Sequence, residues 1–247
     1  MTTIRLFSSD LDGTLLGNTL AVLRFRDFWQ SLEPESRPLL VYNSGRLIDD
    51  MEDIVAEEGL PPPDIYIGGV GTMLSGDHPD IDSAGFLSML GEDFDVAAID
   101  AVMRGIPGIE RQPERYQHGY KSSWYLRDAD ETEIQDIEQR LQEAGYAARL
   151  VYSSSRDLDV LPDRADKGEA LTWFCDSLGI SLGQVVVAGD SGNDAGMFRL
   201  SEVRGVVVGN ALPELVALTS RDSRYYRAKA SMADGVIEGL KHWGVGQ

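Results

Sequence analysis

Short apolar runs alternate with segments of helical periodicity in the N-terminal and C-terminal parts of the chain. Within residues 20–32, for example, Leu23, Phe28 and Leu32 are spaced to share one helix face. The pattern predicts strands at 4–9, 38–45, 64–71, 185–190 and 204–209, and helices at 20–32, 47–58, 167–178, 195–200 and 233–243. Near-continuous Val, Ile and Leu strands linked by helices are typical of a parallel sheet covered on both faces. The predicted fold class is therefore α/β, with a doubly wound parallel-sheet (Rossmann-like) core.

The middle of the chain, from about Ser75 to Asp157, interrupts this rhythm. It opens with GDHPDIDSAG, which resembles a linker, and continues with predicted helices at 95–103 and 131–143 and predicted strands at 121–127, 148–154 and 157–162. Strands of alternating polarity together with a pair of helices indicate a small α+β module. We therefore expect a core domain formed by residues 1–78 and 159–247, with a module inserted at residues 79–158.

The charge balance narrows the set of partners. The chain has 22 basic and 41 acidic residues, a net charge of −19. Such a surface repels nucleic acid and anionic membranes, so neither is expected as a partner, and a phosphate site must gather its own positive charge. No apolar run reaches the roughly 18 residues of a membrane span, and the N-terminus does not resemble a signal peptide. The single cysteine, Cys175, fits a reducing compartment, so a cytoplasmic location is expected.

Polar side chains gather where the predicted core strands end. In open α/β sheets, ligands bind in the crevice beyond the carboxyl ends of the strands. Clusters dispersed along the chain are therefore expected to meet in one crevice. These clusters are Asp10 with Asp12, Ser44 with Arg46, Lys167, and Asp190 with Asn193 and Asp194.

The carboxylates of these clusters indicate a metal site. Asp190 taken alone could merely cap the following helix. Asp10, Asp12, Asp190 and Asp194 together would place four carboxylates in one pocket, where two unit charges about 4 Å apart repel by roughly 4 kcal/mol at an effective dielectric of 20. A bound cation would relieve this repulsion. Because all four side chains offer oxygen, the pattern favours Mg²⁺ over Zn²⁺.

Lys167 lies where the first turn of a helix is expected. A cation there opposes the helix dipole by about 0.3–1 kcal/mol, a conflict that an anion bound in front of the helix would remove. The alternative is a solvated lysine that tolerates this small penalty.

The stretch DLDGTLLG does not fit a calcium loop, because the sixth residue from Asp10 is Leu15 instead of glycine and the twelfth is Ala21 instead of glutamate.

Four motifs carry a family resemblance. DLDGT, NSGR, a lone lysine before a helix and GDSGND, in that order, resemble the motifs of the haloacid dehalogenase (HAD) superfamily of phosphatases. The inserted module stands where that superfamily carries its type IIB α/β cap. The similarity extends over nearly the whole chain to the sucrose-phosphate phosphatase group through KSSWYL, VYSSSRDLDVLP, GDSGNDAGMF and RYYRA. Within that group, NSGRLIDD and ERYQHGYKSSWYL are most similar to phosphatases of mannosylfructose phosphate.

The resemblance implies phosphate ester hydrolysis through a covalent aspartyl-phosphate. Asp10 would be the nucleophile, and Asp12 would protonate the leaving sugar oxygen and then take a proton from the attacking water. Ser44 and Lys167 would hold the phosphoryl oxygens. Ser44 stands where many relatives carry threonine, and the hydroxyl is retained.

The resemblance also implies Mg²⁺ as the cofactor. The ion would be held by Asp10, by Asp190 and by the backbone carbonyl of Asp12. Asp194 would bind the ion's waters or orient its ligands. These residues are the four carboxylates that the charge argument selects. Asn193 would help to position the phosphate or Lys167.

The implied substrate is a phosphorylated non-reducing disaccharide, with mannosylfructose 6-phosphate favoured over sucrose 6-phosphate and other phosphosugars. An upstream glycosyltransferase would supply it. Trp124 is predicted in the core of the module, and Arg46 could pair with a core carboxylate instead of the substrate. The rival functions are a phosphosugar mutase and a phospho-receiver signalling module. The candidate substrate-binding residues are Ser44, Gly45, Arg46, Lys121, Ser122, Ser153, Arg156, Asp157, Lys167 and Asn193.

Overall fold

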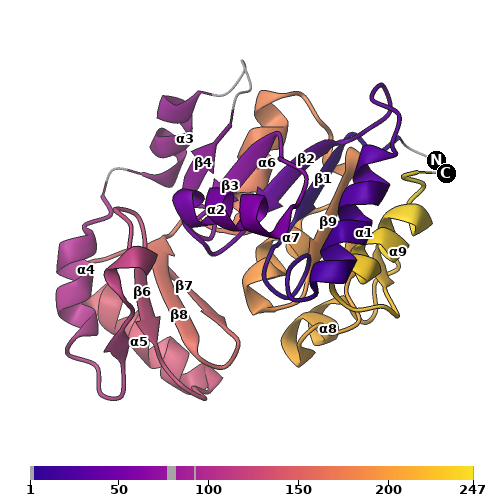
Figure 1. Ribbon diagram of the computed structural model, residues 1–247. Coiled ribbons are helices and arrows are strands. Elements are labelled where there is room, and N and C mark those ends of the chain that lie inside the picture. Colours follow the sequence, from indigo (N-terminus) through magenta and orange to yellow (C-terminus); the bar gives the residue numbers. More distant parts are fainter. Residues whose placement is uncertain (1–2, 77–81, 92, 247) are drawn as a thin grey trace. The chain divides into compact units, whose positions relative to one another are not determined.

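The computed structural model describes residues 3–76, 82–91 and 93–246 (Figure 1). The chain forms two compact units: a core unit from its N-terminal and C-terminal parts, and an inserted module, Asp82–Asp166. The strands of the core unit are β1 (Leu6–Ser9), β2 (Leu39–Asn43), β3 (Ile65–Gly68), β4 (Met73–Ser75), β9 (Val185–Gly189), β10 (Arg204–Val207) and β11 (Tyr225–Arg227). Its α-helices are α1 (Thr19–Gln30), α2 (Ile48–Glu58), α6 (Lys167–Ser177), α7 (Ala195–Arg199), α8 (Pro213–Thr219) and α9 (Met232–His242).

The core strands form one sheet in the order β11-β10-β9-β1-β2-β3-β4. Every neighbouring pair is parallel except β3 with β4 at the edge, which is antiparallel. The chain winds outward from β1 through β2 to β3 and then returns to β9 on the other side of β1. The strand order therefore reverses between β1 and β9, which confirms the predicted doubly wound parallel sheet and places its switch point between these two strands.

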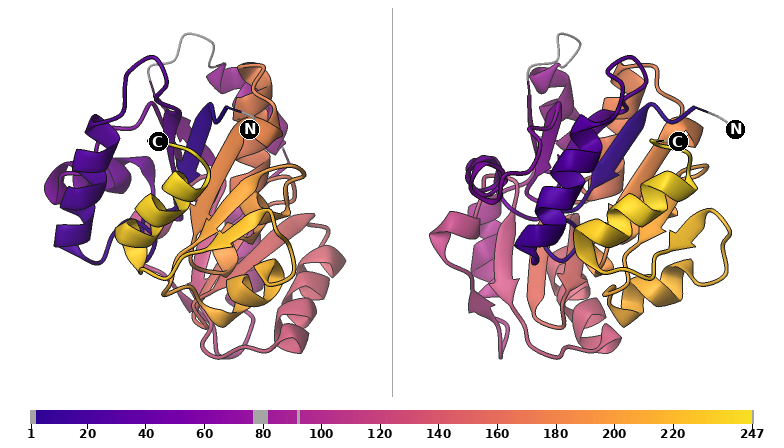
Figure 2. Two further views of the ribbon diagram at one scale, coloured as in Figure 1. Left: turned by 90° about the vertical axis from the view of Figure 1, so that its right-hand side faces the viewer. Right: turned by 45° about the vertical axis from the view of Figure 1, so that its right-hand side comes forward.

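Both faces of this sheet are covered, as the uninterrupted apolar strands predict. On one face, Phe7 of β1 lies within 5.8 Å, between ring centroids, of Trp29 in α1, and α2 and α9 contribute to the same apolar cluster. Figure 2 shows α1 and α9 side by side against the sheet. On the opposite face, the amide of Asn43 donates to the Lys167 carbonyl at the start of α6. Cys175, in α6, is buried, as expected for a structural thiol.

The inserted module is built on a separate four-stranded antiparallel sheet. One of its faces carries an apolar cluster with α4 (Val96–Met103) and α5 (Glu131–Glu143), in which Trp124 is buried as predicted. Helix α5 begins at a reciprocal capping box between Asp130 and Glu133, a local signal that explains why its predicted first residue matches. Its strands are β5 (Glu110–Arg111), β6 (Ser122–Tyr125), β7 (Ala148–Ser153) and β8 (Asp157–Pro162), and its helices are α3 (Ser83–Leu90), α4 (Val96–Met103) and α5 (Glu131–Glu143).

Two local expectations differ from the structure. The predicted linker 76–85 lies partly outside the described residues, and from Asp82 onward it is wrong, because the Asp82 carboxylate caps α3 by accepting from the Ala84 amide at 3.1 Å. The expected module boundary at residue 158 falls inside β8, which continues to Pro162. Among the described helices, none is both long and apolar enough to span a membrane.

Candidate active site

The central residues of the site follow directly after adjacent strands. Asp10 follows β1, Ser44 follows β2 and Asp190 follows β9. Strand β1 pairs in parallel with both neighbours, and Ser9 is level with Tyr42 and Ala188. The three residues that follow these strands therefore lie at the same carboxyl-terminal end of the sheet. The predicted gathering of polar residues at the switch point is therefore present in the core unit.

Lys167 is the centre of this cluster. Its ammonium nitrogen donates to Asp10 Oδ1 at 2.6 Å, Asp194 Oδ1 at 2.7 Å and Asn193 Oδ1 at 3.0 Å. The side chain is fully buried, so three oxygens replace its hydration shell. This geometry excludes the alternative of a solvated lysine at the start of α6.

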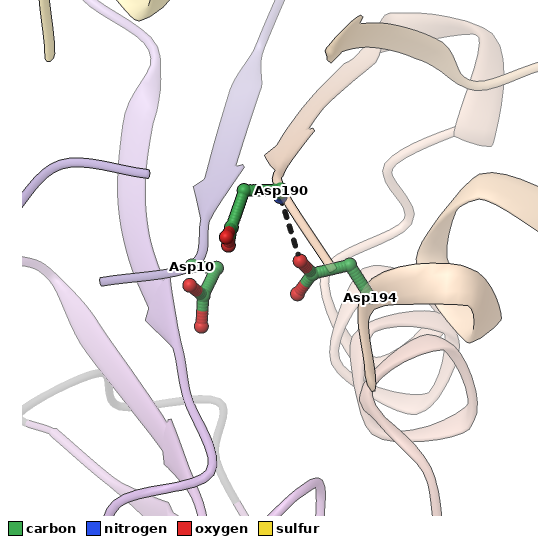
Figure 3. Close-up of side chains that lie close together, drawn as sticks. All are labelled: Asp10, Asp190 and Asp194. Carbon is green, nitrogen blue, oxygen red and sulfur yellow. Dashed lines mark hydrogen bonds between the residues drawn. The ribbon is translucent and has the colours of Figure 1, made fainter. Parts of the chain in front are cut away.

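Asp194 fixes the loop after β9. Its Oδ2 accepts from the backbone amides of Asp190 at 2.9 Å and Ser191 at 3.1 Å, while its Oδ1 accepts from Lys167. Figure 3 shows the carboxylate of Asp10, after β1, close to those of Asp190 and Asp194, both in the segment after β9. Asp194 therefore serves both as a charge beside Lys167 and as a brace for the backbone that presents Asp190.

The turn after β1 depends on glycine at one position. Gly13 has φ +77°, and a Cβ there would lie 2.5 Å from Asp190 Oδ2, so both the conformation and the close approach exclude other residues. Thr14 Oγ1 donates to Asp190 Oδ1 at 3.1 Å. Asn210, which follows β10, donates to the Gly13 carbonyl at 2.7 Å. The DLDGT motif is thus joined to Asp190 through Thr14 and to the segment after β10 through Gly13.

The acidic cluster carries more negative charge than Lys167 can balance. Burial raises the pKa of Asp10 well above its ordinary value; Lys167 opposes this shift, while Asp194 and Asp190 add to it. Burial and repulsion from Asp194 raise the pKa of Asp190 to about 7, against the opposing influence of Lys167. Burial alone would lower the pKa of Lys167, but Asp10 and Asp194 outweigh it and raise that pKa.

The donor set fits a hard divalent cation. Asp10, Asp190 and Asp194 each offer a carboxylate oxygen, and these oxygens lie within 4.8 Å of one another. The only donors are oxygens, which suit Mg²⁺, and a dication would relieve the repulsion that raises the pKa values of Asp10 and Asp190. The carboxylate of Asp12 lies outside this group in the part of the chain that the structure describes.

Asp12 instead pairs with Arg46. Arg46 Nε donates to Asp12 Oδ2 at 2.7 Å and Nη2 donates to Oδ1 at 2.9 Å, a two-point pair. Its remaining terminal nitrogen, Nη1, donates to Asp50 Oδ2 at 2.6 Å. Of the two predicted roles for Arg46, the structure therefore favours pairing with a carboxylate of the core unit.

Ser44 and Gly45 connect the loop after β2 to the acidic cluster. Ser44 is buried, and its Oγ accepts from the Arg46 amide at 3.2 Å. A Cβ on Gly45 would lie 3.7 Å from the Asn193 amide nitrogen, so this loop passes close to the loop after β9. Among the core-unit residues that the sequence predicts for the site, hydrogen bonds join Lys167 to Asp10, Asn193 and Asp194, whereas Asp12 and Arg46 form a separate pair.

Two supporting residues escaped the sequence analysis. Asn43, at the end of β2, donates to the Lys167 carbonyl at 2.9 Å, and Asn210 joins the Gly13 carbonyl to the Met232 amide. Both stand at or just beyond a strand's carboxyl end. The rule that selected Asp10 and Asp190 would therefore also have selected them.

The substrate candidates in the inserted module fall on opposite faces of β6. Ser122 shares the inner face with Trp124: its hydroxyl donates to Asp100 Oδ1 and accepts from Trp124 Nε1, both at 2.6 Å. This use of its hydroxyl favours a structural role over the predicted contact with substrate. On the other face, the Lys121 ammonium lies 2.7 Å from Ser123 Oγ and 2.9 Å from Asp159.

The remaining candidates lie at one end of the β7–β8 hairpin. Ser153 ends β7, Asp157 begins β8, and Arg156 stands between them. Arg156 donates through Nε and Nη2 to Asp157, and its guanidinium lies 5.5 Å from the Tyr125 ring centroid. The Arg156 side chain is half-exposed, so this end of the hairpin presents polar groups to solvent.

Comparisons with known proteins agree with this fold. A HAD subclass IIB sugar phosphatase shares the fold, with a TM-score of 0.69 at 15% identity over 98% of this chain and 99% of that one. The sucrose-phosphatase of Synechocystis sp., solved with sucrose and phosphate, has a TM-score of 0.88 at 31% identity, with 98% of both chains covered. The sheet, its switch-point aspartates and the likeness to the sucrose-phosphatase define a phosphatase, and its fold is that of the HAD subclass IIB enzyme.

The family assignment is more specific. The chain belongs to the sucrose-6F-phosphate phosphohydrolase family, whose model matches residues 3–244. It is 54% identical over 245 residues to the mannosylfructose-phosphate phosphatase of Agrobacterium fabrum, a match that covers 99% of both chains. The predicted membership and the predicted class of enzyme, a phosphoric monoester hydrolase, are confirmed.

Proposed function

We propose that the chain is a Mg²⁺-dependent phosphatase that converts mannosylfructose 6-phosphate to mannosylfructose and phosphate through an aspartyl-phosphate on Asp10. The observation that carries the chemistry is the buried cluster at the switch point, where Lys167 contacts both Asp10 and Asp194. The 54% identity to a mannosylfructose-phosphate phosphatase supports the choice of substrate.

The reaction divides into two displacements at phosphorus. First, an Asp10 carboxylate oxygen attacks phosphorus and the bond to the sugar oxygen breaks, while Asp12 supplies a proton to that oxygen. Water then attacks the aspartyl-phosphate, Asp12 takes a proton from it, and the Asp10–phosphorus bond breaks. Lys167 and Ser44 hold the phosphoryl oxygens while charge is redistributed.

Mg²⁺ completes the charge balance in this proposal. Asp10, Asp190 and the backbone carbonyl of Asp12 would hold it, with Asp194 orienting these groups. When bound, the ion screens the negative phosphoryl group from the carboxylate that attacks it. The oxygen-only donor set and the raised pKa values of Asp10 and Asp190 support this assignment.

Mg²⁺ is expected to raise the melting temperature. A ligand at 100 times its Kd stabilises the folded state by about 2.7 kcal/mol, or about 5–10 °C for a chain of this length. The shift should be larger at pH 8 than at pH 5.5. The folded-state pKa of Asp190 is about 7, above its unfolded value, so metal-free stability falls as pH rises toward and past 7, whereas fewer protons then compete with the metal. Thermal melts with EDTA and with Mg²⁺ at both pH values measure this.

Two controls decide the metal assignment. Asp190→Asn removes one proposed ligand and should greatly reduce the shift. EDTA should also abolish phosphate release, and added Mg²⁺ should restore it. Equal melting temperatures with and without the ion, together with activity that survives chelation, would remove Mg²⁺ from the proposal.

The substrate is tested by steady-state kinetics on mannosylfructose 6-phosphate, sucrose 6-phosphate and simple hexose phosphates. We expect the highest kcat/KM for mannosylfructose 6-phosphate. Sucrose 6-phosphate is the second candidate, supported by the family model and by the likeness to the Synechocystis sucrose-phosphatase. Equal kcat/KM on all three classes would show that the protein does not select a disaccharide. An isomeric phosphosugar without free phosphate would identify a mutase.

The inserted module completes the proposal as a substrate-selecting cap. Its candidate sugar-binding residues are Lys121, Ser153, Arg156 and Asp157, whose charged and hydroxyl groups suit a polyol. The phosphosugar itself would be supplied by a glycosyltransferase that joins a sugar to a phosphorylated acceptor. The net charge of −19 supports a small-molecule partner over nucleic acid or an anionic membrane.

A further inference from the structure

The guanidinium of Arg46 is shared between two carboxylates of different kinds. Its Nε and Nη2 atoms face Asp12, which follows the proposed nucleophile by two residues. Its Nη1 atom faces Asp50, which lies in the first turn of α2 and has no part in the proposed chemistry. Asp12 and Asp50 therefore occupy separate nitrogens of one planar group.

This division constrains how Arg46 meets Asp12. An arginine side chain has many rotamers, and a guanidinium paired at one side only can swing or turn about its bonds. Contact with Asp50 at 2.6 Å ties Nη1 to a helix packed on the sheet through Met51 and Val55. With Nη1 occupied, the Nε and Nη2 atoms remain for the two oxygens of Asp12.

Asp12 needs such support because it is exposed. Its side chain keeps 55% of its accessible surface, whereas Asp10 keeps 4%. Among the described residues, the side chain that donates hydrogen bonds to this carboxylate is that of Arg46. Each carboxylate oxygen has a further lone pair, so Asp12 can accept another hydrogen bond while it contacts Arg46.

We propose that Asp50 is a positioning residue that orients the acid–base carboxylate of Asp12 through Arg46. The inference rests on the proposed function, in which Asp12 protonates the leaving oxygen. It adds a residue that touches neither the substrate nor the metal ligands and whose effect depends on the leaving group.

The test compares two substrates in Asp50→Ala, which removes the acceptor for Arg46 Nη1. The sugar oxygen of a disaccharide phosphate needs a proton to leave, whereas p-nitrophenyl phosphate releases a stable phenolate that does not. We expect kcat/KM to fall about tenfold on the disaccharide phosphate, a fraction of the 10²–10⁴ that general acid–base catalysis contributes. On p-nitrophenyl phosphate it should change by less than about twofold, because phosphoryl transfer to Asp10 is intact.

Two further variants of α2 serve as controls. Asp49→Ala removes the same side chain from the same helical turn at an exposed position, so kcat/KM should stay at the wild-type value on both substrates. Asp50→Glu keeps a carboxylate within reach of Arg46 and should recover most of the loss. Melting temperatures near that of the wild type would show that the folded state is retained.

A double-mutant cycle separates positioning from other effects. Asp12→Ala removes the group that Asp50 is proposed to orient, so adding Asp50→Ala should cause no further loss on the disaccharide phosphate. An undiminished further loss would overturn the proposal, as would an equal fall on both substrates in Asp50→Ala alone or wild-type activity on both. A wild-type protein that releases no phosphate from any phosphosugar would instead refute the proposed function.

Discussion

Asp10→Asn is expected to reduce phosphate release by roughly 10⁵-fold or more, the scale seen when a hydrolase loses its nucleophile. An amide oxygen is a much poorer nucleophile than a carboxylate, and this variant cannot form the aspartyl-phosphate. The fold should persist, because the amide oxygen can still accept the hydrogen that Lys167 donates to Asp10 Oδ1. Phosphate release under saturating substrate measures the loss.

Stability provides the matching control for Asp10→Asn. The pKa of Asp10 is raised in the folded state, chiefly by burial, so its ionisation destabilises the metal-free protein as pH rises. The variant lacks this charge and should melt at or above the wild-type temperature at pH 8 in EDTA. Substantial turnover in a variant that melts normally would refute Asp10 as nucleophile.

Lys167→Met is expected to have the second largest effect. The variant leaves Asp10 and Asp194 without their buried cation, and removing one partner of a buried pair typically costs about 3–5 kcal/mol. Loss of a positive group that holds the phosphoryl oxygens should also lower kcat/KM by about 10²–10³-fold. Phosphate release and thermal melts measure the two effects separately.

The pH dependence identifies the cause of the destabilisation in Lys167→Met. Without the ammonium, the pKa of Asp10 rises further, so the free energy of unfolding is higher at low pH and decreases as pH increases. The difference in melting temperature from wild type should therefore be larger at pH 8 than at pH 5.5 in EDTA, and Mg²⁺ should reduce it. A difference independent of pH would indicate lost packing instead of uncompensated charge.

Local signals account for the elements that the sequence predicts well. Helix α5 begins at a capping box. Strands β1, β2 and β9 are short buried runs with polar residues at their ends. Helix α3 was missed because Asp82 sits in a stretch whose Gly, Pro and Asp residues indicate a linker. Strands β4 and β11 have three residues each, too few for a clear alternating pattern, and they form by pairing with β3 and β10 respectively.

The inward orientation of Ser122 could have been predicted from the sequence. Side chains alternate along a strand, so Ser122 and Trp124 must share a face. A prediction that places Trp124 in the core therefore also turns Ser122 inward, as the structure shows. Lys121 and Ser123 then belong to the other face, where both contact Asp159.

The sequence by itself determined the class of fold, the gathering of Asp10, Ser44, Lys167 and Asp190 at one edge, and the family resemblance. Apolar runs specify parallel strands, and the carboxyl ends of such strands meet at a switch point wherever they stand in the chain. Only the tertiary structure decided that Arg46 is shared between Asp12 and Asp50 and that Lys167 is fully buried. In so acidic a chain many carboxylates could pair with one guanidinium, and only packing sets the distances that choose among them.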